Sequence, residues 1–144
     1  MVLTRAELVR SLQHEVEILL HLASKVDRTA LDYRPSPKQR STIELLRYLT
    51  MMGPALLEVA RTGTFDGAAW NVQERATDGL SFDQAVAAIA AEREAYARLA
   101  DLSDADLRGE IAPWGETSSR GSFIVNFVLC GHAAYRMQLF LYLK

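Results

Sequence analysis

Four stretches of the chain place apolar residues at three- and four-residue steps, which is the spacing of one face of an α-helix. We predict helices over about residues 5–26, 42–61, 82–102 and 122–144. The stripe is clearest in the first stretch, where it consists of Leu8, Leu12, Val16, Leu19, Leu20 and Ala23. In the third stretch, the predicted inner side is less well marked and consists of Val86, Ile89, Ala90, Arg93, Tyr96 and Ala97.

Three of these stretches follow a capping box. In this motif a Ser or Thr side chain accepts a hydrogen bond from the amide three residues later, and the Glu or Gln there accepts one from the capping residue's own amide. The boxes are Thr4 with Glu7, Ser41 with Glu44, and Ser81 with Gln84. Pro54 lies in the middle of the second stretch and cannot donate to the carbonyl of Thr50, so we expect a kink or a break there.

The connections between the predicted helices set the expected topology. Pro35 and Pro37 favour an extended link before the second helix. Residues 62–80 form a long link with a short helix expected around residues 70–75, and residues 103–121 form a loop in which Trp114 closes a Pro-Trp-Gly turn onto the core. Four helices in 144 residues predict a single domain, an all-α four-helix bundle over residues 1–144. The link over residues 62–80 is long enough for a crossover between the second and third helices.

Composition excludes several classes of partner. Apolar residues make up 49% of the chain and charged residues 24%, which is typical of a globular domain. The net charge of −2 provides no basic field for nucleic acid or an anionic membrane. Cys130 is the single cysteine, so neither an intramolecular disulfide nor a Cys-rich zinc site is expected.

Location is predicted from the N-terminal and the closing segments of the chain. The N-terminal residues lack the apolar core and the cleavage site of a secretory signal, so we expect a cytoplasmic protein. The closing stretch is apolar nearly all round, which is typical of a helix that is central in its bundle or packs against a partner chain. A membrane span is not expected, because polar residues interrupt this stretch, namely Asn126, His132, Arg136 and Gln138.

The most informative polar residues are His132 and Arg136, which lie one turn apart on one face of the closing helix. Arg136 stays protonated and cannot ligate a metal, and its charge repels a cation beside His132. Three interpretations of His132 therefore stay open: a hydrogen-bonded core histidine, half of an anion-binding pair with Arg136, or a metal ligand. No Ser-His-Asp set or phosphate-binding loop accompanies them in the sequence.

Two segments resemble the DinB-like superfamily of bacterial four-helix bundles. "LDYRPSPKQRSTIELLRYLTMMG" is similar to that family's proline-rich approach to the second helix, where a run S-x-x-x-L-L-x-H-L carries the first metal ligand. "GHAAYRMQLFLYLK" is similar to its closing helix, where H-x-x-x-H carries the other two. The resemblance covers nearly the whole chain and implies a DinB-like fold. Together with the apolar closing helix, it also implies a homodimer.

The resemblance places the three ligand positions on Tyr48, His132 and Arg136. It therefore implies a degenerate metal site with no metal cofactor, in which His132 is the one ligand left. We expect a protein that is not a metalloenzyme and that binds a small anionic ligand at this Tyr-His-Arg cluster. The alternative is a metal-dependent thiol S-transferase or isomerase, with nickel or zinc held by His132 and a replacement ligand taken from Glu44, His14 or His21. The sequence leaves the question of catalysis open.

Overall fold

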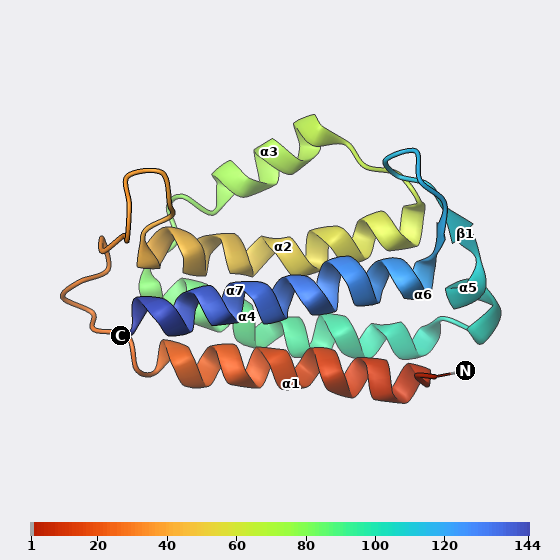
Figure 1. The fold of residues 1–144 in the computed structure, drawn as a ribbon, viewed down its shortest axis with the longest axis horizontal. Helices are drawn as coiled ribbons and strands as arrows, with labels where there is room; N and C mark the ends of the chain where they lie inside the picture. Colours follow the sequence, from red (N-terminus) through yellow and green to blue (C-terminus); the bar gives the residue numbers. More distant parts are fainter. Residues whose placement is uncertain (1) are drawn as a thin grey trace.

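Four long helices form the body of the protein in the computed structural model, which describes residues 2–144 (Figure 1). They are α1 (Arg5–Ala23), α2 (Thr42–Thr62), α4 (Phe82–Ala97) and α7 (Cys130–Tyr142). The closing helix is built in three consecutive pieces, because a short α6 (Arg120–Phe123) and a π-helical turn η2 (Ile124–Leu129) lead directly into α7. The predicted all-α four-helix bundle is confirmed.

The chain crosses the bundle once between its second and third long helices. The short helix α3 (Gly67–Ala76) runs back along the outside of α2, so that α4 starts at the same end as α2 and runs parallel to it (Figure 1). Both α1 and α2 pack against α4 and α7. The predicted crossover is confirmed, and it places α4 and α7 on opposite sides of the pair formed by α1 and α2.

The helix starts follow the predicted capping boxes. Thr4, Ser41 and Ser81 each accept a hydrogen bond from the amide three residues later, and each box is complete. At Pro54, where a kink or a break is expected, the helix does not break, because α2 continues from Thr42 to Thr62. Leu49, Met52 and Leu56 are buried on either side of the proline, so both halves of the helix pack against the bundle.

The ends of the long helices differ from the prediction by a few residues. α1 ends at Ala23 rather than at Val26. α4 ends at Ala97 and tightens into a 3₁₀ turn, η1 (Arg98–Asp101), as the last turn of a helix often does.

The second loop contains structure too short for a sequence pattern to show. A helix α5 (Asp104–Arg108) is followed by an antiparallel pair, β1 (Glu110–Ile111) and β2 (Ser118–Ser119). Gly115 in the connecting turn has a φ of 90°, which a residue with a side chain rarely adopts. The ring centroid of Trp114 lies 5.3 Å from that of Phe123 and 4.9 Å from that of Phe127, so this turn packs onto the closing helix.

The closing helix buries only part of its apolar surface within the chain. His132, Leu139 and Tyr142 of α7 face the interior of the bundle. Several large apolar side chains face solvent on the other side, namely Phe127, Met137, Phe140 and Leu141. Within residues 2–144, no helix is both long enough and apolar enough to cross a membrane.

Candidate functional site

A cluster of three polar side chains lies in the core of the bundle, centred on His132. The imidazole of His132 is 0% exposed, and its Nε2 shares a hydrogen bond with the hydroxyl of Tyr96. The carboxylate of Glu92, which is 2% exposed, lies 3.5 Å from the same nitrogen. Glu92 and Tyr96 are one turn apart on α4, so the facing helices α4 and α7 build the cluster.

Gly53 on α2 makes room for this cluster. A Cβ atom at this position would overlap the hydroxyl of Tyr96 and would lie 2.7 Å from Nε2 of His132. Any side chain larger than hydrogen would therefore push the tyrosine and the histidine apart. The backbone of α2 therefore packs directly against the cluster that α4 and α7 build.

Burial favours the neutral forms of all three groups. Desolvation lowers the pKa of His132 to about 4 and raises the pKa of Glu92 well above its usual range. Desolvation also raises the pKa of the Tyr96 hydroxyl, and the neighbouring Glu92 carboxylate adds to this rise. The contact between His132 and Glu92 is therefore a contact between neutral groups rather than a buried ion pair.

Two atoms of the cluster lack a hydrogen-bond partner among the described residues. They are Oε1 of Glu92 and Nδ1 of His132. Unpaired buried polar atoms are rare and destabilise a fold. The two unpaired atoms therefore lower the free energy of unfolding compared with a core in which every polar atom is hydrogen-bonded.

Tyr48 lies apart from His132 in its contacts. Its hydroxyl accepts a long hydrogen bond of 3.5 Å from the hydroxyl of Tyr135, and its ring packs 3.8 Å from the guanidinium carbon of Arg40. Burial raises the pKa of the Tyr48 hydroxyl further above its ordinary value, and the hydrogen bond with Tyr135 adds to this effect. The phenolate form that would bind a metal is therefore disfavoured.

Arg136 reaches toward α1 and not toward His132. Its guanidinium forms an ion pair with the carboxylate of Glu15, whose side chain is 11% exposed, while that of Arg136 is 31% exposed. Across residues 2–144, no hydrogen bond joins any two of Tyr48, His132 and Arg136. Each of the three residues has its own partner: Tyr135 for Tyr48, Tyr96 for His132 and Glu15 for Arg136.

The residues around His132 do not fit the metal that the resemblance implies. In the described part of the chain, no three His, Cys, Asp or Glu side chains gather closely enough to hold an ion. The replacement ligands named in the sequence lie elsewhere, and His21 among them is exposed on α1. Glu44 accepts hydrogen bonds from the amide of Ser41 and from Arg34, and His14 lies on the exposed surface 3.7 Å from Glu17.

Sequence reasoning missed the partners of His132 and Arg136. The inner side of α4 consists of Ala85, Ile89, Glu92 and Tyr96. Of the six residues predicted to face inward there, Arg93 is exposed, whereas Glu92 beside it is buried. The spacing of Ile89, Glu92 and Tyr96 at three- and four-residue steps could have indicated that Glu92 is buried, because it places the acid on the same helix face as two residues that face the core. No comparable signal connects Glu15 with Arg136, which lie on different helices.

Comparison with solved structures identifies the fold. The chain is similar to a DinB-like protein, YjoA, from Bacillus subtilis, with a TM-score of 0.73 over 94% of this chain and 89% of that chain. The sequence identity is 15%, so the similarity shows the fold alone. No protein-family model matches the chain, and no curated protein matches it significantly. The fold of this protein is therefore DinB-like.

Proposed function

We propose that this protein is a DinB-like bundle that binds a small anionic ligand at Tyr48, His132 and Arg136 and does not use a metal centre. The observation that carries the proposal is the ion pair between Arg136 and Glu15, in which the third ligand position already binds a carboxylate. A guanidinium donates to carboxylates through a planar set of N–H groups and has no lone pair for a metal. The residue type at this position thus favours an anion over a cation.

Binding would proceed by exchange of one carboxylate for another. Arg136 is 31% exposed, so a ligand from solvent can reach its guanidinium, but Glu15 occupies it in the free protein. Neutral His132 and the hydroxyl of Tyr135 on α7, and the hydroxyl of Tyr48 on α2, are further donors or acceptors. The proposal therefore expects Glu15 to act as a competitor of the ligand.

Thermal unfolding with compact anions, acetate and succinate, tests this proposal. We expect the anions to raise the Tm of the parent protein, Arg136→Ala to abolish the shift, and Glu15→Gln to enlarge it, because the competing carboxylate is gone. Arg93→Gln is the matched control, since Arg93 is an exposed arginine on α4 outside the cluster. A shift that persists in Arg136→Ala would overturn the assignment of this site.

Metal analysis of the purified protein tests the alternative, a metal-dependent thiol S-transferase or isomerase. The proposal expects far less than one nickel or zinc ion per chain. One ion per chain that is lost in His132→Ala would favour the alternative and contradict the proposal. The Glu92 carboxylate, 3.5 Å from the imidazole, would then be the first residue to test as a second ligand.

The homodimer and the cytoplasmic location belong to the same proposal. The exposed apolar side chains of the closing helix support the dimer, because large apolar residues grouped on one helix are typical of a surface that packs against another chain.

A further inference from the structure

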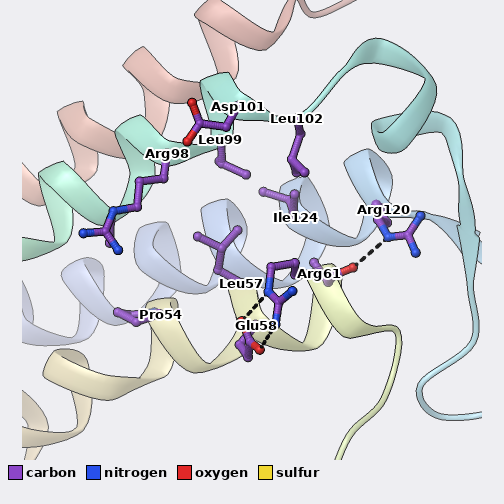
Figure 2. Close-up of a pocket in the computed structure, with 12 residues that line it drawn as sticks. Pro54, Leu57, Glu58, Arg61, Arg98, Leu99, Asp101, Leu102, Arg120 and Ile124 are labelled. Carbon is purple, nitrogen blue, oxygen red and sulfur yellow. Dashed lines mark hydrogen bonds and ion pairs between the residues drawn. The ribbon is translucent and has the colours of Figure 1, made fainter.

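A cavity of about 420 Å³ lies at the end of the bundle where the α1 N-terminus is found, between α2, the end of α4 with η1, and the start of the closing helix. Its volume falls in the range of sites that bind small organic molecules. Figure 2 shows the residues that line it, and Tyr48, His132 and Arg136 are not among the described residues that do so. The cavity is thus separate from the Tyr-His-Arg cluster.

The interior of the cavity is apolar. Leu57 from α2, Leu99 and Leu102 from the η1 region, and Ile124 from η2 turn their side chains toward one another across it (Figure 2). Ala95 contributes a small wall residue on α4. Such walls favour a ligand with an apolar body, because its burial removes apolar surface from water.

Three arginines line the cavity, and they differ in how their charges are compensated. Arg61 is held by Glu58, with two nitrogen–oxygen distances of 2.8 and 2.5 Å, so its charge is largely neutralised. Arg98 has only a contact of 3.9 Å with Glu94, and both side chains are highly exposed. Contacts of this kind between exposed groups contribute little. The charge of Arg98 therefore remains available to a ligand.

Arg120 is held by backbone carbonyls rather than by a carboxylate. Its Nε donates to the carbonyl of Ala60 at 3.1 Å and its Nη1 to the carbonyl of Asp106 at 3.4 Å, which leaves further N–H donors free. No ion pair involves Arg120 anywhere in residues 2–144, although its charge contributes to lowering the pKa of the Asp106 carboxyl. Asp101 lines the rim, but Figure 2 shows its carboxylate pointing away from the apolar side chains. A guanidinium held in place by backbone bonds loses little freedom on binding an anion.

From this arrangement we propose that the cavity binds an organic carboxylate with an apolar body, whose carboxylate pairs with Arg120 and whose body lies among Leu57, Leu99, Leu102 and Ile124. Arg98 adds attraction at the other side of the opening. The inference shares with the proposed function only the negative charge of the ligand. Different residues carry it, so either proposal can fail without the other.

Octanoate is the probe for this site, with octanamide as its neutral counterpart and acetate as a carboxylate without an apolar body. Titration calorimetry on the full chain should show one octanoate site. We expect octanamide and acetate to bind at least about tenfold more weakly, because each lacks one of the two features that the cavity recognises. In spectra of methyl-labelled protein, octanoate should shift the resonances of Leu57, Leu99, Leu102 and Ile124.

Variants then locate the site. Ala95→Phe fills the cavity and should abolish octanoate binding, whereas Ala91→Phe, at an exposed position one turn earlier that does not line the cavity, should not. Arg120→Gln should weaken octanoate at least about tenfold, and Arg98→Gln should weaken it less. Because Arg120 also holds two backbone carbonyls, Ala95→Phe keeps the proposal testable if Arg120→Gln does not fold.

Three results would overturn the inference: no octanoate binding to the parent, binding that survives Ala95→Phe, or equal affinity for octanamide. Octanoate binding that is retained in Arg136→Ala but lost in Ala95→Phe would support it, even if the acetate response at Arg136 is absent. An acetate response at Arg136 without any octanoate binding would support the proposed function and refute the cavity site.

Discussion

The backbone of α2 at Gly53 lies against the imidazole of His132 on α7, so that a Cβ atom at Gly53 would come within 2.7 Å of Nε2. The hydroxyl of Tyr96 fills the rest of that space. The position of the buried cluster is therefore set by a residue that contributes no side chain to it.

Gly53→Ala is expected to destabilise the protein by about 1–3 kcal/mol, because the added methyl group forces apart well-packed groups in the core. Gly79→Ala is the matched control. A Cβ there would meet no atom within 4 Å, so its effect should be near zero or slightly stabilising. Urea unfolding of both variants measures the difference. Equal stability of Gly53→Ala and the parent would show that the cluster accommodates the added methyl group, which contradicts the prediction.

Tyr96→Phe removes the hydroxyl that bonds to His132 and lies 3.4 Å from Glu92. We expect a loss of about 1–3 kcal/mol, since two buried polar groups lose their shared partner. Tyr135→Phe loses only a long contact of 3.5 Å with Tyr48 in a half-buried position and should cost less than about 1 kcal/mol. If the two phenylalanine variants unfold at the same urea concentration, the hydrogen bond in the core contributes nothing.

The pKa of His132 is lowered to about 4, compared with 6.5 for an unperturbed histidine. The free energy of unfolding therefore depends on pH in the acidic range. Between these values the unfolded chain binds a proton that the folded protein does not, so His132 destabilises the fold as the pH falls from about 6.5 to about 4. The slope approaches about 1.4 kcal/mol per pH unit from this group alone. The difference in unfolding free energy between the parent and His132→Gln, measured across this window, isolates the effect. A difference that does not change with pH would mean that His132 titrates normally.

Glu92 acts in the opposite direction. Because its pKa is raised in the folded state, the folded protein keeps a proton that the unfolded chain releases above about pH 4.5. Its contribution to stability is therefore lost as the pH rises from there toward the raised pKa. Glu92→Gln keeps the shape without the titration, so its stability relative to the parent should increase with pH across this range. A constant offset between the two proteins would refute the protonated state of Glu92 in the core.

The exposed apolar side of the closing helix predicts a dimer. Cys130, Ala134, Met137 and Leu141 follow one another at three- and four-residue steps, and all are exposed. Introducing charge with the double variant Met137→Glu/Leu141→Glu should give a monomer by light scattering after size-exclusion chromatography. Val72→Glu on α3 is the control, because Val72 is 62% exposed but lies on a different surface. If the parent protein has the mass of one chain, the prediction of a dimer is wrong.

The elements of this fold could be predicted because their signals are local. The capping boxes at Thr4, Ser41 and Ser81 mark three helix starts, and the long link after α2 indicates the crossover. A signal within one helix does not decide where tertiary packing acts, as at Pro54, where α2 continues past the proline and is buried on both sides of it.

The candidate site could be predicted only along α7. The spacing of His132 and Arg136 is visible in the sequence, but a helical period does not say which residue of another helix each one meets. Glu15 and Glu92 looked like surface acids because most acids on helices are solvated. Because of the crossover, α4 and α7 both pack against α1 and α2, and only their inward side chains meet across the core, which gives His132 its buried neighbours.

The π-helical turn over Ile124–Leu129 precedes the whole of α7 and sets its rotation. Successive residues of an α-helix are about 100° apart around the axis. Deleting one residue from this turn, so that it tightened to an ordinary α-helical turn, would rotate α7 by about that angle relative to α6. His132 would then leave its place beside Gly53, and a different side of the helix would face the bundle. The register of the final helix, and with it the choice of which side chains are hidden and which are displayed, thus depends on six residues that carry no polar side chain except Asn126.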